Sequence, residues 1–251
     1  MYTRVKTAAE IESMRTSGKM LATVLDYLKQ KLEIGMTTKD LANLASQKLT
    51  ELGGKPAFLG YHGFPDVICI SINDEVVHGI PSTQKIIQDG DLVSLDFGVN
   101  YNGMITDSAI TVVAGTSNNK QKQQLVNVTE QSMYDGIAQL HHKVSVGDIS
   151  SAIQKTLEKQ HYGIVRDLVG HGVGHDLHEE PNIPNYGKAG KGNVLEAGMT
   201  IAIEPMATLG DHRVTLDADG WTIRTADGSL SAHFEHTILI TETGSETLTA
   251  I

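Results

Sequence analysis

The chain has 251 residues, of which 40% are apolar and 20% are charged, a composition typical of folded globular proteins and unlike that of disordered or fibrous chains. Its formal net charge of -10 argues against stable binding of nucleic acid, because an acidic surface repels a phosphate backbone. The single cysteine, Cys69, excludes an intrachain disulfide and a zinc site built from thiolates, and it favours a reducing compartment such as the cytoplasm.

The first half of the chain predicts two helices followed by strands. Thr7 and Glu10 have the spacing of a capping box, and leucines then recur with helical spacing. Gly35 is expected to interrupt this pattern, after which Thr38 can cap a second helix that ends at Gly53. Short runs of branched residues bounded by turn-forming residues predict strands at 67–72, 92–99 and 104–113.

The second half repeats this order. Apolar spacing predicts a helix over about 118–142 and a second helix that starts at Asp148, and strand-like segments follow at 200–206 and 232–241. Because no linker or change of composition separates the two halves, we expect one α+β domain with pseudo-symmetric halves rather than two domains. The domain is expected to span residues 1–251, with halves at about 1–115 and 116–251.

Four acidic residues on the predicted strands are the first candidates for chemistry. Asp96 alternates with apolar residues, which leaves its carboxylate on the other face of its strand, and Glu204 and Glu235 repeat this pattern. Asp107 shares a face with apolar neighbours, where an ionised carboxylate is costly unless a cation or a partner compensates its charge. Each acid alone could be a solvated surface residue, but four together favour a functional site.

A glycine-rich turn, GHGVGHDLHEEP at 170–181, adds histidine to these acids. The glycines around His171 leave room for a close approach to its ring, although a surface loop with solvated histidines would look similar. Four carboxylates and one imidazole would neutralise two divalent cations. Oxygen-rich ligation with one nitrogen suits Mn, Fe(II), Co or Zn.

Together these motifs resemble those of the type I methionine aminopeptidases, a branch of the pita-bread metallopeptidases. The resemblance implies an α+β fold with pseudo-two-fold symmetry, in which two helix pairs cover an antiparallel sheet. It also implies metal-dependent removal of the initiator methionine from nascent proteins whose second residue is small, by a hydroxide that bridges the metals. The matching segments cover essentially the whole chain and lie at 61–81, 94–111, 170–181, 199–205 and 219–241.

The resemblance also assigns roles to individual residues. It implies that Asp107 and Glu235 bridge two divalent metal ions, that Glu204 shuttles a proton, and that His78 and His178 are catalytic residues contacting the scissile carbonyl of the substrate. The implied metal ligands are Asp96, Asp107, His171, Glu204 and Glu235. The implied methionine pocket consists of Phe58, Tyr61, Phe64, Cys69, Leu177 and Trp221.

Two alternative functions remain open from the sequence. The first is an X-Pro aminopeptidase, which would share the fold but usually carries an additional N-terminal domain. The second is a non-catalytic scaffold that binds proteins, which should have lost metal ligands, whereas none is lost here. We expect a monomeric cytoplasmic enzyme whose partners are peptide or nascent-protein N-termini. Any association with the ribosome is expected to be transient. No membrane span is expected, because no stretch approaches the ~20 apolar residues that a span needs.

Overall fold

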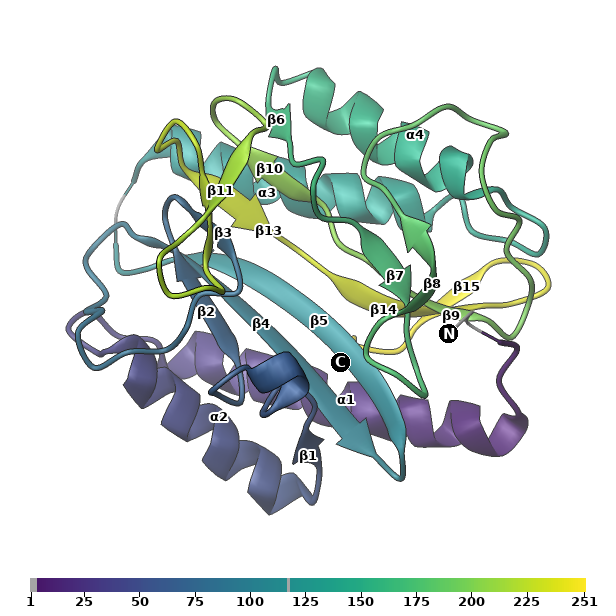
Figure 1. The fold of residues 1–251 in the computed structure, drawn as a ribbon, viewed down its shortest axis with the longest axis horizontal. Coiled ribbons are helices and arrows are strands. Elements are labelled where there is room, and N and C mark those ends of the chain that lie inside the picture. Colours follow the sequence, from purple (N-terminus) through teal and green to yellow (C-terminus); the bar gives the residue numbers. More distant parts are fainter. Residues whose placement is uncertain (1–3, 117) are drawn as a thin grey trace.

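The computed structural model describes residues 4–116 and 118–251. A helix pair followed by strands occurs twice along the chain. Figure 1 shows one helix pair along one side of the strands and the second pair along the other side. The helices are α1 (Ala8–Lys31), α2 (Thr38–Leu52), α3 (Lys120–Ile137), α4 (Val146–Glu158) and the short 3-10 turn η1 (Tyr61–Gly63).

The strands pair antiparallel throughout, as predicted, but in the described residues they form four small sheets rather than one. The strand orders are β1-β4-β2 with β5 on β4, β13-β10-β6, β11-β12-β3 and β15-β14-β9-β7-β8. Their bounds are β1 (Lys55–Pro56), β2 (Cys69–Ile72), β3 (Glu75–Val77), β4 (Leu92–Tyr101), β5 (Met104–Val113), β6 (Gly163–Ile164), β7 (Gly170–Gly172), β8 (Glu179–Ile183), β9 (Thr200–Ile203), β10 (Met206–Thr208), β11 (Val214–Leu216), β12 (Ile223–Thr225), β13 (Ser231–His233), β14 (His236–Ile240) and β15 (Ser245–Thr247).

The helix starts follow from side-chain capping. The predicted capping box of Thr7 and Glu10 is present at the start of α1. The prediction that Thr38 caps α2 was wrong by one residue, because Thr37 has the extended backbone of a cap and its side chain accepts a hydrogen bond from the backbone N–H of Asp40. Thr38 instead occupies the first helical position.

The second helix pair also differs from its predicted bounds. Helix α4 begins at Val146, two residues before the predicted start at Asp148, because the Ser145 hydroxyl and the Asp148 side chain form a capping box with Ser145 as the cap. Gly147 lies inside this first turn, where a Cβ atom would meet the carbonyl oxygen of Lys188 at 2.1 Å. Helix α3 ends at Ile137, several residues before the predicted end, and the chain continues in tight turns.

Two predicted continuous strands are interrupted where an acidic residue lies. The predicted strand at 200–206 is divided into β9 and β10 by Glu204 and Pro205, and the predicted strand at 232–241 is divided into β13 and β14 by Phe234 and Glu235. Strand β9 pairs with β14, whereas β10 pairs with β13 and β6. The chain therefore changes sheets at both acids.

Apolar contacts hold the helices on one face of the strands. Leu21 of α1 and Leu41 of α2 pack in one cluster with Leu95 and Phe97 of β4. Leu125 of α3, Ile149 of α4, Ile201 of β9 and Ile238 of β14 belong to a second cluster. Side chains alternate along a strand, so the side chain of Asp96 lies on the face of β4 that points away from the helices. This face is turned toward the interior of the molecule.

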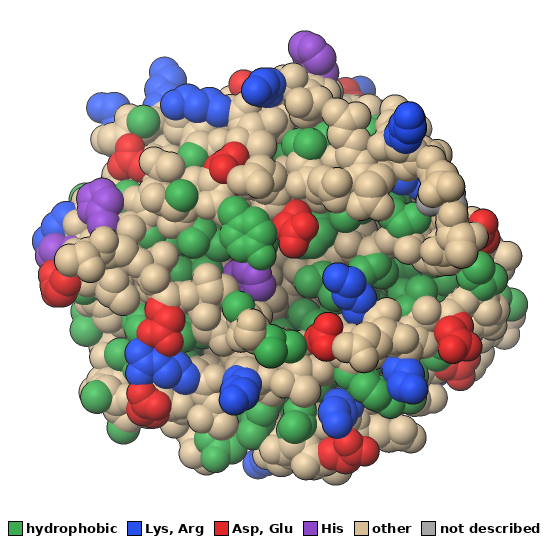
Figure 2. Space-filling model, turned by 180° about the vertical axis from the view of Figure 1, so that it is seen from behind, with side chains coloured by type: hydrophobic (Ala, Val, Ile, Leu, Met, Phe, Trp, Pro, Cys, Tyr) green, Lys and Arg blue, Asp and Glu red, His purple; other side chains and the backbone are tan. Residues whose placement is uncertain are grey.

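Charged side chains of both signs occur on the surface. Figure 2 shows acidic and basic side chains interspersed over the face seen from behind. Within the described ranges, no helix has both the length and the hydropathy needed to cross a membrane.

Candidate active site

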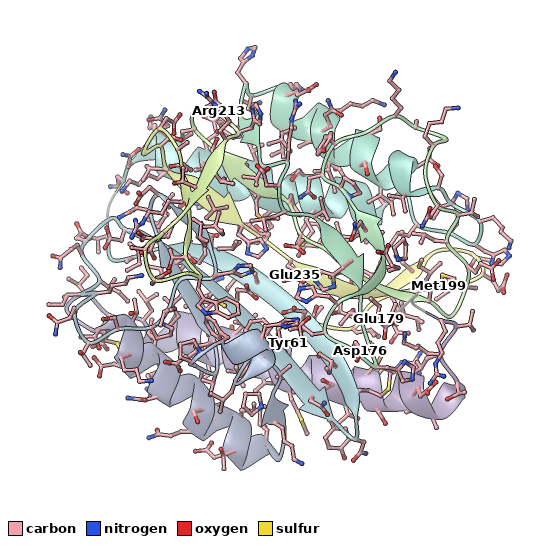
Figure 3. The ribbon with its side chains drawn as sticks, in the orientation of Figure 1. Tyr61, Asp176, Glu179, Met199, Arg213 and Glu235 are labelled. Carbon is pink, nitrogen blue, oxygen red and sulfur yellow. The ribbon has the colours of Figure 1, made fainter. Side chains whose placement is uncertain are left out.

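A cavity of about 140 Å³ contains every residue that the sequence predicted for the site. The central hairpin β4–β5, the loop around η1 and the histidine-rich turn enclose it, and Figure 3 shows Tyr61 and Glu235 near the centre of the molecule, on different elements. Its lining residues are Phe58, Tyr61, Phe64, Cys69, Val77, His78, Asp96, Asp107, Leu168, Val169, His171, Leu177, His178, Glu204, Trp221 and Glu235.

The hairpin and the strand break bring two acids together. In the β4–β5 register Gly98 lies opposite Asp107. The backbone of Glu235, which lies between β13 and β14, pairs with Ala109 through hydrogen bonds of 2.9 and 3.2 Å. The Thr237 hydroxyl accepts a hydrogen bond from the N–H of Asp107 and donates one to its carbonyl, both at 2.8 Å. These contacts fix the backbones of Asp107 and Glu235 on neighbouring segments.

Three of the predicted ligands form a compact group. Asp107, His171 and Glu235 each offer an atom that lies within 4.8 Å of the atoms offered by the other two, and all three side chains are buried. Across the described ranges, Asp107 Oδ1 and Glu235 Oε1 are buried without a hydrogen-bond partner, as is Asp96 Oδ1. Buried carboxylate oxygens without a donor are costly, and a cation would compensate them.

The tautomer of His171 suits a metal ligand. Its Nδ1 lies 2.9 Å from the carbonyl oxygen of Gly172, which can only accept, so Nδ1 carries the hydrogen and Nε2 presents a lone pair. Nε2 lies 3.5 Å from Glu204 Oε1. Asp96 and Glu204 line the same cavity but lie outside the compact group of three.

Burial governs the protonation of these groups. It raises the pKa of Asp96 to about 7 and that of Glu204 to about 8, and it raises the pKa values of Asp107 and Glu235 well above the ordinary range, with neighbouring carboxylates adding to the effect for both. Burial also lowers the pKa of His171 to about 3, so its imidazole is neutral at pH 7. Oxygen donors with one neutral imidazole fit a divalent metal ion.

The two predicted catalytic histidines also face the cavity. The Nδ1 atom of His178 lies 2.8 Å from the hydroxyl of Tyr61, and its ring centroid lies 4.3 Å from that of His171. His78 has a positive φ of 58°, an uncommon conformation that turns the chain after β3. Burial lowers the pKa of His78 to about 4 and lowers the pKa of His178 below its usual range, so both rings are neutral.

An apolar wall lies beside the acids. The ring of Phe64 meets those of Phe58 and Trp221 edge to face, with centroid separations of 6.5 and 5.1 Å. A Cβ atom at Gly98 would lie 2.6 Å from the Phe58 ring, so glycine permits this ring to pack against the hairpin. The same apolar cluster includes Tyr61, Cys69 and Leu177.

Sequence reasoning missed one buried polar residue beside the site, His233 at the end of β13. Its Nε2 lies 3.6 Å from Glu204 Oε2, and its side chain is 1% exposed. Its alternation with Glu235 along the chain was a usable signal, because residues two apart share a strand face. The cavity also includes Val77, Leu168 and Val169, which no motif had marked.

Comparison with known proteins shows which family the chain belongs to. The model of metallopeptidase family M24 matches residues 12–242. The methionine aminopeptidase of Clostridium perfringens is 43% identical over 247 residues, with 98% of each chain covered, and methionine aminopeptidase 1 of Bacillus subtilis is 44% identical over 246 residues, again with 98% of each covered. The chain therefore belongs to metallopeptidase family M24.

Within this family the chain is a member of the methionine aminopeptidase group, and the predicted pita-bread fold is confirmed. The crystal structure of methionine aminopeptidase from Thermotoga maritima matches with a TM-score of 0.97 and 45% identity over 99% of this chain and 100% of that one. The prolidase of Pyrococcus furiosus matches with a TM-score of 0.79 but 24% identity, and 65% of it is covered, so that likeness shows the fold alone. The X-Pro alternative is not favoured.

Proposed function

We propose that this chain removes methionine from the free N-terminus of peptides and nascent proteins whose second residue is small, with divalent metal ions held in the cavity. The observation that carries the proposal is the group of buried carboxylate oxygens without donors around the lone pair of His171, beside an apolar wall. The methionine aminopeptidase group to which the chain belongs supports the same reaction.

We propose two ions, chosen from Co, Mn, Fe(II) and Zn. Four carboxylates provide enough negative charge to balance two divalent cations, and Asp107 and Glu235, which belong with His171 to the compact group, would be shared between them. When bound, the ions would lower the pKa of water enough to supply a nucleophile at neutral pH. The ligand set is Asp96, Asp107, His171, Glu204 and Glu235.

The remaining polar groups would act on the substrate. Glu204 would accept a proton from water and pass it to the leaving amine, because its carboxylate faces the cavity. Since the Tyr61 hydroxyl can donate to Nδ1 of His178, Nε2 of that ring would carry a hydrogen and donate it to the scissile carbonyl oxygen. His78, on the same cavity, would stabilise the negative charge that develops there.

The apolar wall would select the methionine side chain. An unbranched thioether is flexible and makes favourable contacts with aromatic edges, which Phe58, Phe64 and Trp221 supply. Cys69 is also suited to this wall, because burial raises the pKa of its thiol well above the usual range and keeps it uncharged. The proposed pocket consists of Phe58, Tyr61, Phe64, Cys69, Leu177 and Trp221.

The cellular setting is proposed from composition. One buried cysteine and an acidic net charge suit a monomer in the cytoplasm that meets its substrates as they emerge from the ribosome, with at most transient ribosome contact.

The test is release of free methionine from a Met-Ala-Ser peptide by metal-free protein, and again after addition of Mn²⁺, Co²⁺, Fe²⁺ or Zn²⁺. We expect release after metal addition only, and the metal bound per chain should approach two. An N-acetylated copy of the peptide is the control, because it lacks the free amine and should not be cleaved.

Two results would contradict the proposal. Release of the first residue from Ala-Pro-Ser but not from Met-Ala-Ser would favour an X-Pro aminopeptidase. A folded protein that binds divalent ions but cleaves neither peptide would favour a scaffold that has lost catalysis.

A further inference from the structure

His233 is a buried histidine for which the reaction outlined above has no use. It ends β13 and its side chain is 1% exposed. Its backbone is held by Thr111, whose hydroxyl accepts a hydrogen bond from the His233 N–H at 2.9 Å and donates one to the His233 carbonyl at 2.8 Å. The position of the ring is therefore set by the link between β13 and β5.

Both ring nitrogens of His233 lack a hydrogen-bond partner among the described residues. Buried polar atoms of folded proteins nearly always have a partner, and an imidazole that served packing alone would gain nothing from its nitrogens. An unpartnered buried imidazole beside carboxylates therefore points to a hydrogen bond that forms when the site holds metal ions.

The carboxylate of Glu204 lies between two imidazoles. Its Oε1 is 3.5 Å from Nε2 of His171, and its Oε2 is 3.6 Å from Nε2 of His233. The two rings have different hydrogen placement, because the Gly172 carbonyl fixes the hydrogen of His171 on Nδ1, whereas no contact fixes that of His233. One oxygen of Glu204 thus faces a lone pair, and the other faces a ring that is free to donate.

We propose that His233 is a positioning residue that donates a hydrogen bond from Nε2 to Oε2 of Glu204 and so directs Oε1 toward the metal ion. This inference rests on the proposed function, in which Glu204 is a metal ligand. Hydrogen bonds to ligating carboxylates fix their orientation and strengthen metal binding. His233 touches neither the substrate nor, in this proposal, the metal itself.

The test compares His233→Leu with His233→Gln in the full chain. Leucine removes the donor, whereas the glutamine amide can still donate to Glu204. Titration calorimetry of metal-free protein with Mn²⁺ should give an affinity about 10–100-fold weaker for the leucine variant, a loss typical of ligand-orienting residues, and an affinity within about 3-fold of wild type for the glutamine variant. The visible absorption of the Co²⁺-loaded proteins should change in the leucine variant only.

A control is His142→Leu, which removes a histidine outside the cavity by the same substitution. The Nδ1 of His142 accepts a bond from the N–H of Ala197 at 3.0 Å, outside the cavity, so this variant should keep the wild-type affinity for Mn²⁺. Thermal unfolding of each metal-free variant separates loss of fold from loss of affinity.

Two outcomes would overturn the inference. Wild-type Mn²⁺ affinity in a folded His233→Leu protein would show that the ring orients nothing. Equal losses in the glutamine and leucine variants would make the imidazole itself a ligand rather than a donor to Glu204. Failure of the proposed function is distinguishable from both, because it would appear in the wild-type protein as absence of methionine release.

Discussion

The buried ion pair between Lys6 and Glu179 offers a sharp test of the forces that hold the active-site turn. Lys6 Nζ lies 3.0 Å from Glu179 Oε2, and the two side chains are 0% and 2% exposed. The other carboxylate oxygen, Oε1, accepts the backbone N–H groups of His175 and Asp176 at 2.8 and 3.2 Å. Figure 3 shows Glu179 and Asp176 close together, in the turn that carries His178.

Replacing Lys6 with Met should destabilise the protein by about 3–5 kcal/mol, because it removes one partner from a buried ion pair while the Glu179 carboxylate stays buried. Burial lowers the pKa of Lys6, and the hydrogen bond and attraction to Glu179 oppose that effect, with a further contribution from Glu10. Adding Glu179→Gln should recover most of the loss, since both charges are then absent and the amide oxygen can still accept the N–H groups of His175 and Asp176.

The assay is thermal unfolding of metal-free protein followed by circular dichroism. The unfolding midpoint of a domain of this size shifts by ~2–4 °C for each kcal/mol of destabilisation, so the Lys6 variant should unfold roughly 6–20 °C below wild type. The control is Arg15→Met, which removes an exposed ion pair with Glu246 and should shift the midpoint far less. If the Lys6 variant unfolds no earlier than the Arg15 variant, or if the double variant is less stable than the single one, the reasoning about burial is wrong.

Three further predictions follow from the same structure. Asp107→Ala should abolish methionine release and lower the amount of bound metal measured by atomic absorption, while the circular dichroism spectrum stays near that of wild type. His178→Ala should lower kcat and leave the metal content unchanged. Loss of metal in the His178 variant would make His178 a ligand. Above about pH 7 the buried histidines are neutral in both the folded and the unfolded chain, whereas burial raises the folded-state pKa of Glu204 to about 8. The native metal-free protein there keeps a proton that the unfolded chain has lost, so its unfolding free energy should fall as pH rises from about 7 to 9; denaturant titrations with chelator should show this decline, and added Mn²⁺ should remove it. Thr37→Ala should cost about 1 kcal/mol in urea denaturation through loss of the α2 cap, and a neutral result would contradict the capping assignment.

Local signals predicted the regular elements where the chain needed no distant partner. The capping box at Thr7 and the leucine spacing after it gave α1 almost to the residue, and Gly53 ends α2 in the left-handed conformation that glycine favours. The run at 104–113 forms β5 within its predicted bounds. The start of α4 could have been found from the spacing of Ser145 and Asp148, but Gly147 between them is a poor helix former and obscured it.

The strand breaks could not be predicted, because they depend on partners distant in sequence. Branched residues favour an extended chain through Glu204 and through Glu235. Pro205 is a local sign of a break after the first acid, but nothing local signals that the neighbouring strand changes at either one. Pro205 has no N–H to donate, and its carbonyl oxygen accepts from Phe234 at 3.3 Å instead, while Glu235 pairs with Ala109. These long-range contacts release both acids from a regular ladder and turn them toward the hairpin.

The sequence by itself predicted the residues that we propose carry the chemistry, because acids alternating with apolar residues and glycines around a histidine are local patterns and the order of the motifs resembles that of a known family. Only the tertiary structure decided their geometry: which oxygens lack donors, which nitrogen of His171 presents a lone pair, and that His233 lies on the far side of Glu204. Such properties arise from distances between segments that are far apart along the chain, and these distances are fixed only when the two helix pairs pack the strands together.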